Sequence, residues 1–146
     1  MRSSRGDGWY LRPAGGNYDR HVTTRIPDDG GFGKEAGYSR AVRRAQMIAV
    51  SGTAALEHGQ VLHPGDAYAQ TKHALEVALA AAAKLGAKPE DVLRTRLLLA
   101  PGCDWRAAVR AHGEVFAASP PANTTYFVGG LIPEGALVEV ELDALA

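Results

Sequence analysis

One long alanine-rich segment constrains the fold of this chain most strongly. Residues 67–85 carry many alanines, with Leu75 and Leu79 four positions apart, as on the buried face of a helix. Asp66 stands where a helix N-cap residue belongs, and Gly86 stands where a helix-ending glycine belongs. Because alanine side chains are small, we expect this helix to pack closely against a sheet.

The remaining regular segments alternate between strand and helix patterns. Asp104 precedes an amphipathic segment, and Pro120-Pro121 ends it. The order β-β-α-β-α-β-β predicts an α+β, two-layer domain, with a mixed sheet and two helices on one face. We expect strands at 38–42, 47–51, 92–99, 123–128 and 137–142, a loop at 53–65, and a second helix at 105–118.

The sheet face away from the helices is predicted to be charged. In the last strand Val138, Val140 and Leu142 alternate with Glu139 and Glu141. The strand at 92–99 is expected to place its side chains in two sets: Leu93, Thr95, Leu97 and Leu99 toward the helices, and Arg94, Arg96 and Leu98 away from them. A face that mixes charged and apolar side chains is a candidate for a subunit interface that contains a site.

Composition narrows the class of protein. The chain has 146 residues, which suits one domain, and 16 Lys plus Arg balance 16 Asp plus Glu. This balance, without a basic run, argues against nucleic acid as the main partner. The single cysteine, Cys103, suits a reducing compartment, and no apolar run is long enough for a membrane span. We therefore expect a cytoplasmic protein without a membrane partner.

Residues 1–36 differ in composition from the rest of the chain. They hold seven glycines, several arginines and one apolar cluster, Trp9-Tyr10-Leu11, and they lack the apolar run of a signal peptide. We expect an extended or loosely ordered arm at 1–36, followed by a folded domain at 37–146. The apolar cluster either docks on the domain or a neighbouring subunit, or belongs to a partly disordered tail.

Several short motifs in this order resemble the Rid/YjgF/UK114 family of reactive-intermediate deaminases. The motifs are GYSRAV at 37–42, VSG at 50–52, AQT at 69–71 with ALE at 74–76, DVLRT at 91–95, PA at 121–122, and PEGALVEVE at 133–141. The resemblance implies a homotrimer with a central barrel, helices outside, and three pockets between subunits. It also implies hydrolysis of enamines or imines to ammonia and a keto acid, without a metal or bound cofactor.

The chain departs from this family at one position that bears on function. The family arginine that grips the substrate carboxylate follows the Pro-Ala pair, and here that residue is Asn123. An amide supplies hydrogen bonds but no charge. The usual cysteine two positions later is Thr125. The chain therefore resembles the arginine-lacking branches, and we expect amino-acid imines to be poor substrates.

The candidate site residues each have a structural alternative. Glu139 matches the family glutamate near the pocket, and the resemblance implies that it donates and accepts protons, unless it only pairs with Arg94 or Arg96. Tyr38 and Ser51 match positions that line the family pocket; the alternatives are interface packing for Tyr38 and a backbone hydrogen bond for Ser51. Asn123 and Thr125 point to one side of their strand and are expected to orient the ligand.

Two arginines, one histidine and the cysteine are further candidates for a role at the site. Arg96 is the better candidate to replace the missing arginine, and Arg110 is weaker because its helix position points toward solvent. His112 lies in the apolar stripe of the second helix and is expected to be partly buried and hydrogen-bonded. Cys103 is expected to be incidental, and the histidines show no metal-site spacing.

Three hypotheses about function follow. The leading one is a homotrimer that hydrolyses or tautomerises a small conjugated enamine, imine or related carbonyl compound. The second is a non-catalytic trimer that binds small molecules or protects proteins, because a fold does not by itself carry a function. The third is a biosynthetic enzyme that acts on one pathway intermediate.

Overall fold

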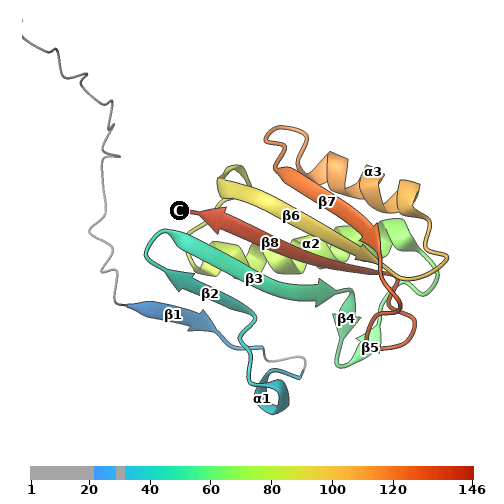
Figure 1. Cartoon of the computed structure of the whole chain (residues 1–146), viewed down its shortest axis with the longest axis horizontal. Helices are drawn as coiled ribbons and strands as arrows, with labels where there is room; N and C mark the ends of the chain where they lie inside the picture. The colour runs from blue at the N-terminus through green and yellow to red at the C-terminus, as the bar shows by residue number, and fades with distance from the viewer. Residues whose placement is uncertain (1–21, 29–31) are drawn as a thin grey trace, which may run out of the picture.

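The structure is a computed structural model that describes residues 22–28 and 32–146. The expected cluster Trp9-Tyr10-Leu11 lies outside the described residues. A six-stranded sheet in the order β1-β2-β3-β8-β6-β7 forms one layer, and a two-stranded hairpin, β4-β5, projects beside it (Figure 1). The strands are β1 Thr23–Ile26, β2 Ala41–Arg44, β3 Met47–Ala54, β4 Leu56–Glu57, β5 Gln60–Val61, β6 Val92–Leu99, β7 Ala122–Phe127 and β8 Val138–Leu145.

Two long helices cover one face of the sheet, as predicted. These are α2, Ala67–Lys84, and α3, Trp105–Val115; the short α1, Gly33–Ala36, lies near β1 and β2, and a 3-10 turn spans Pro89–Asp91 (Figure 1). The β6–β7 pair is parallel, with α3 in the crossover, and every other pair in the large sheet is antiparallel. The two-layer α+β fold with a mixed sheet is therefore confirmed.

Local capping explains where the two helices begin. The Asp66 side chain accepts a hydrogen bond from the Ala69 N–H, and the Asp104 side chain accepts from the Arg106 and Ala107 N–H groups. Each carboxylate thereby satisfies backbone donors that a helix start leaves unpaired. Both helix starts were predicted from the sequence.

The core lies between α2 and the sheet. The alanines of α2 let this helix approach the strands closely, and most of the larger buried side chains belong to the strands. Fully buried members include Ala74, Leu75 and Ala78 of α2 and Ile48, Leu97, Val140 and Leu142 of the sheet. The predicted alternation in β8 is confirmed, because Val138, Val140 and Leu142 are buried and the glutamates between them are on the open face.

Five details of the fold differ from the sequence expectation. The β2–β3 connection is the two-residue Ala45-Gln46, not four residues, and β3 continues to Ala54. The expected loop at 53–65 contains the β4-β5 hairpin, and β8 continues to Leu145. Leu93 is 53% exposed, because the ladder between β6 and β8 shifts register between Val92 and Arg94 and reverses the alternation there.

Part of the expected N-terminal arm is built into the sheet. β1 pairs with β2 over four residues, and Ile26 packs against the core. A four-residue strand has too short a pattern to be predicted from sequence, and its place at the sheet edge depends on β2 being present. Among residues 22–28 and 32–146, no helix is long and apolar enough to cross a membrane.

Candidate functional site

A cavity of about 1230 Å³ lies where the N-terminal segment meets β3, α2 and the start of β8. The structure brings three of the predicted site residues together along it: Tyr38, Ser51 and Glu139. Mainly apolar side chains complete the wall, including Ile26, Val77, Leu98, Leu131 and Ile132. A mostly apolar cavity with a few convergent polar groups is the usual form of a small-molecule site.

Glu139 supplies the carboxyl group of this cavity. In the sheet it lies opposite Ala54 on β3 and Leu98 on β6, and its carboxyl group lies against Gly52. Burial raises the pKa of Glu139, the nearby Glu141 carboxylate raises it further, and the Arg40 charge opposes both. A carboxyl group whose pKa is raised toward neutrality can donate a proton and take it back during a reaction.

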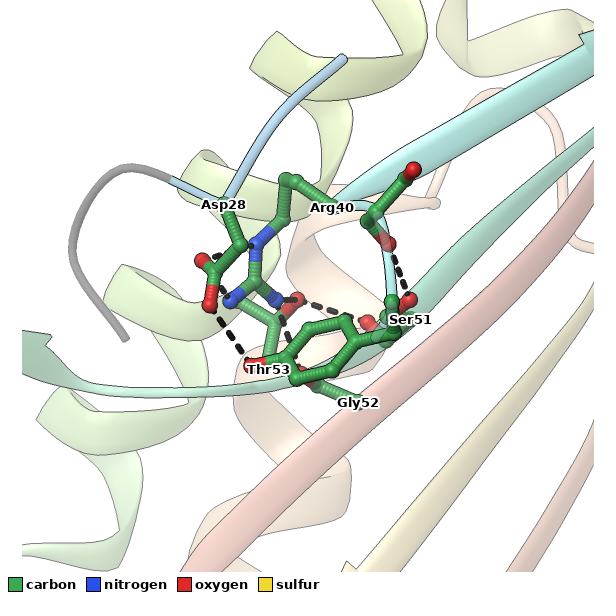
Figure 2. A network of polar contacts seen from close by, with 7 residues as sticks. Asp28, Arg40, Ser51, Gly52 and Thr53 are labelled. Atoms are coloured by element: carbon green, nitrogen blue, oxygen red, sulfur yellow. Dashed lines mark hydrogen bonds and ion pairs between the residues drawn. The ribbon is translucent and has the colours of Figure 1, made fainter. Parts of the chain in front are cut away.

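An arginine that the sequence analysis did not single out lies beside Glu139 in the same cavity. Arg40 donates from Nη1 to the Gly52 carbonyl and to Thr53 Oγ1, each at 2.8 Å. It also donates to Oδ1 of Asp28, from Nη2 at 2.6 Å and from Nε at 3.2 Å (Figure 2). The guanidinium is therefore fixed between the sheet and the N-terminal segment.

Tyr38 belongs to the same network. Its hydroxyl donates to Oδ2 of Asp28 at 2.6 Å, so both carboxylate oxygens of Asp28 are bound. Burial alone would raise the pKa of Asp28, but the hydrogen bonds from Tyr38 and Arg40 and the Arg40 charge outweigh it and lower the pKa. The same hydrogen bond raises the pKa of Tyr38. Tyr38 therefore faces the cavity as a neutral phenol.

Ser51 is occupied by the backbone. Its hydroxyl donates to the Ser39 carbonyl at 2.6 Å, and its N–H donates to the Arg40 carbonyl at 3.0 Å. Ser51 therefore makes the hydrogen bond to the backbone that the sequence analysis gave as its structural alternative. The Ser51 hydroxyl oxygen can still accept a hydrogen bond, because the contact with Ser39 occupies only its proton and leaves its lone pairs available.

Asn123 and Thr125 lie in a different place from Glu139. In the parallel β6–β7 ladder they stand beside Thr95 and Leu97, on the helix-covered face of the sheet. Together with Trp105 they line a second cavity of about 340 Å³. The expectation that they orient a ligand held by Glu139 is therefore not met within one chain, because alternation in the sheet places them on opposite faces.

A hydrogen-bonded chain fixes the orientation of Asn123. Its Nδ2 donates to Thr95 Oγ1 at 3.1 Å, and its Oδ1 accepts from Thr125 Oγ1 at 2.8 Å. Thr95 Oγ1 lies 2.8 Å from Nε2 of His112. Burial lowers the pKa of His112, which favours the neutral ring, and a neutral imidazole forms this hydrogen bond with the Thr95 hydroxyl through Nε2. The prediction of a partly buried, hydrogen-bonded His112 is confirmed.

The two arginines considered as replacements lie outside the large cavity. Arg96 pairs with Asp143 at 3.1 Å and with Glu141 at 3.5 Å on the open face. Arg110 lies over the Tyr68 ring at 5.0 Å. In the described part of the chain, no ion pair joins Glu139 to Arg94 or Arg96. Both arginines are thus occupied by neighbours, whereas Arg40 lines the cavity.

Cys103 is buried, and burial followed by the Asp104 charge raises the pKa of its thiol. Within residues 22–28 and 32–146, no three His, Cys, Asp or Glu side chains are gathered to hold a metal ion.

Arg40 and Asp28 were missed for different reasons. Arg40 stands two residues after Tyr38, and that spacing alone could have placed both side chains on one side of an extended segment. Asp28 carried only a turn signal, in Asp28-Asp29-Gly30-Gly31. Its approach to Arg40 depends on the pairing of β1 with β2, which brings residues twelve positions apart into contact.

The fold and cavity define a small α+β protein with a carboxyl group and an arginine beside one apolar pocket. Residues 32–146 match the profile of the family described as Endoribonuclease L-PSP. The chain belongs to this family, which is also known by the names YjgF and Rid.

Individual relatives agree with this assignment. An uncharacterized protein of Streptomyces coelicolor is 37% identical over 120 residues, which cover 82% of this chain and 90% of that protein. The 3-aminoacrylate deaminase RutC of Acinetobacter baylyi is 33% identical over 106 residues, covering 72% of this chain and 83% of the relative. A YjgF/YER057c/UK114-family crystal structure from Mycobacterium tuberculosis is 33% identical, with a TM-score of 0.76, and covers 86% of this chain and 100% of its own.

Proposed function

We propose that this protein hydrolyses or tautomerises a small conjugated enamine, imine or related carbonyl compound in the large cavity. The observation that carries the proposal is the Glu139 carboxyl group, which lies against Gly52 beside an apolar cavity and has a raised pKa. The similarity to a relative named 3-aminoacrylate deaminase supports an enamine as the substrate class.

The proposed reaction needs one group that gives and takes protons. Protonated Glu139 donates its proton to the enamine carbon, and the C=C–N unit becomes an iminium ion. The Glu139 carboxylate then takes a proton from water as its oxygen bonds to the iminium carbon, forming a carbinolamine. Glu139 then gives its proton to the nitrogen, the C–N bond breaks, and the Glu139 carboxylate takes the hydroxyl proton, which releases ammonia and a carbonyl compound and restores protonated Glu139. If water does not attack, loss of a proton from the iminium nitrogen completes an enamine-to-imine tautomerisation.

We propose that the substrate lacks a free carboxylate, as expected for an arginine-lacking branch of the family. Asn123 carries no charge, and Arg96 is paired with Asp143 and Glu141. Two cations line the cavity: Arg40, which is paired with Asp28, and Lys84, whose charge is offset by the Glu35 carboxylate on the same lining. A carboxylate that enters this mostly apolar cavity loses its hydration and gains little compensating charge. Small amino-acid imines are therefore poor substrates in this proposal.

The site is proposed to be completed by assembly into a homotrimer. In the part of the chain that the structure describes, β7 is the last strand of the sheet and its outer edge is unpaired. Tyr126 and Phe127 of β7 and Trp105 of α3 are exposed. Exposed apolar side chains along a free strand edge are typical of a surface that a second protein covers. In this proposal Asn123 and Thr125, which lie on β7 at this edge, are the groups that each copy contributes to a pocket between subunits.

The test compares the purified protein with Glu139→Gln, and Glu76→Gln is the matched control because that glutamate is exposed on α2 and does not line the cavity. Freshly generated 2-iminopropionamide serves as the uncharged substrate and 2-iminopropionate as its carboxylate counterpart, with ammonia release measured and oligomer mass checked by sedimentation. We expect turnover of the amide that Glu139→Gln lowers about 10²–10⁴-fold without loss of ligand affinity. Fast turnover of 2-iminopropionate contradicts the charge preference. An assembled trimer that binds the amide without turnover favours the non-catalytic hypothesis.

A further inference from the structure

The large cavity contains a complete carboxylate-binding arrangement that the chain itself fills. We propose that Asp28 is a specificity-determining residue: it occupies the position in which Arg40 would bind a ligand carboxylate, and so excludes carboxylate ligands from the Glu139 cavity. This inference extends the proposed function, because it assigns the preference for uncharged substrates to one side chain of this protein.

The orientation of Arg40 is set by the sheet rather than by Asp28. Nη1 donates to the Gly52 carbonyl and to Thr53 Oγ1, both at 2.8 Å, and Thr53 is buried. These two contacts use one end of the guanidinium and leave its Nε–Nη2 edge facing the N-terminal segment (Figure 2). The planar guanidinium is thus held so that this edge can meet a carboxylate.

Three side-chain donors converge on the Asp28 carboxylate. Nε and Nη2 of Arg40 bind Oδ1 at 3.2 and 2.6 Å, and the Tyr38 hydroxyl binds Oδ2 at 2.6 Å. The side chain of Asp28 is 4% exposed and that of Arg40 is 18% exposed, so solvent screens their ion pair weakly. A guanidinium and a phenol on the two oxygens of one carboxylate are the contacts that a substrate carboxylate would need.

This arrangement lies inside the cavity and not behind it. Asp28, Tyr38 and Arg40 all line the same cavity as Glu139, and Arg40 bonds the carbonyl of Gly52, against which Glu139 lies. A carboxylate held by Arg40 in place of Asp28 would therefore occupy the cavity that Glu139 also lines. Lys84 and Glu35 also line the cavity and bear opposite charges.

Asp28 competes with ligands at an advantage because it belongs to the same chain. It follows β1, which pairs with β2 from Thr23 opposite Arg44 to Ile26 opposite Ala41. This pairing holds the carboxylate next to Arg40 at a high effective concentration, so a dissolved carboxylate must displace a tethered one. With Asp28 in place, a further carboxylate would also add a like charge to the cavity.

The test measures pyruvate binding by calorimetry, with its uncharged amide, pyruvamide, as the matched ligand. The variants are Asp28→Asn, Asp28→Ala, Arg40→Gln and the Asp28→Asn/Arg40→Gln double variant. Glu76→Gln, an exposed carboxylate on α2, is the control for loss of one negative charge. Circular dichroism and the oligomer mass confirm folding of each protein; Asp28→Asn keeps the shape of the side chain if Asp28→Ala does not fold.

We expect weak pyruvate binding in the parent protein and in Glu76→Gln. In Asp28→Asn the Kd for pyruvate should fall at least tenfold, while the Kd for pyruvamide stays within about twofold, and the gain should vanish in the double variant. The proposal is wrong if the folded Asp28 variants gain nothing, or if the gain survives Arg40→Gln. It is also wrong if the parent protein binds pyruvate tightly and Arg40→Gln alone abolishes that binding.

These outcomes separate this inference from the proposed function. Pyruvate binding requires no turnover, so the Asp28 result stands if Glu139→Gln leaves ammonia release unchanged. Conversely, Glu139-dependent turnover of 2-iminopropionamide together with unchanged pyruvate affinity in Asp28→Asn removes only the role of Asp28.

Discussion

The carboxyl group of Glu139 lies against Gly52 so closely that a Cβ atom on that glycine would overlap it. The contact arises where the β3–β8 ladder shifts register between Val50 and Thr53. A bulge of this kind bends the strand and redirects its neighbours. The absence of a side chain at position 52 therefore makes the space that Glu139 occupies beside the cavity.

Replacing Gly52 by alanine should displace Glu139. We expect Gly52→Ala to lower the free energy of unfolding by about 1–3 kcal/mol, since the added methyl must push the carboxyl group or the strand aside. Turnover of the proposed substrate should fall with it. Gly113→Ala is the control, because Gly113 lies in α3 with open space around its Cα, and there alanine should stabilise by about 0.5–1 kcal/mol. Equal effects in the two variants, measured by urea unfolding, would refute this account.

The raised pKa of Glu139 makes stability depend on pH in a defined direction. Its folded pKa lies above its unfolded value of about 4.3, so the stability it contributes is present below that value and is lost as pH rises through the folded pKa. Glu139→Gln should therefore gain thermal stability relative to the parent protein between about pH 4 and pH 7. A difference in Tm that stays constant over this range would contradict the assignment. Glu76→Gln reports the effect of losing a carboxylate elsewhere.

Asp28 should show the opposite dependence. Hydrogen bonds from Tyr38 and Arg40 lower its folded pKa below the unfolded value of about 3.9. Its contribution to stability is thus present above about pH 4 and is lost as pH falls through the folded pKa. We expect Asp28→Asn to cost about 1.5–3 kcal/mol at pH 7, as for a hydrogen-bonded charged group, and much less at pH 2–3. Chemical unfolding at these pH values measures both, and an equal cost at both would show that the carboxylate charge is not what stabilises the network.

The Thr95 hydroxyl should contribute more than the Thr95 methyl group to the fixed orientation of Asn123 in the second cavity. Thr95→Val keeps the volume but removes the partner of both His112 and Asn123, which should cost about 1–3 kcal/mol. Thr95→Ser keeps the hydroxyl and loses one buried methyl, worth about 0.8 kcal/mol. The NMR signals of the Asn123 amide should shift in Thr95→Val and stay near their parent positions in Thr95→Ser. If Thr95→Ser instead costs more stability and shifts the Asn123 signals more than Thr95→Val does, packing of the Thr95 methyl group dominates.

The sequence predicted most of the fold because the relevant signals are local. Asp66 and Asp104 cap helices through backbone groups two or three residues away, and the alternation of Val138, Val140 and Leu142 follows from the pleat of one strand. Prediction failed at Leu93, where a register shift against β8 decides which way the side chain points. It also failed at Thr23–Ile26, whose strand exists only because β2 offers an edge.

The candidate site was predicted only in part. Tyr38, Ser51 and Glu139 were singled out and do line one cavity, whereas Asn123 and Thr125 lie on the other face of the sheet. Arg96 was preferred over Arg110 because alternation places Arg96 on the charged face, and Arg40 was not singled out. Which carboxylate an arginine meets, however, depends on neighbouring strands: β8 gives Arg96 its partners Glu141 and Asp143, and β1 brings Asp28 to Arg40.

The sequence by itself therefore determined the helices, the central strands and several side chains capable of acid–base chemistry or hydrogen bonding. It did so because capping, periodicity and alternation act over a few neighbouring residues. Only the tertiary structure decided which charges meet and which are left to face a ligand. Contacts such as Asp28 with Arg40, or Glu139 with Gly52, join segments far apart in the chain. They depend on strand order and register, which no local pattern encodes.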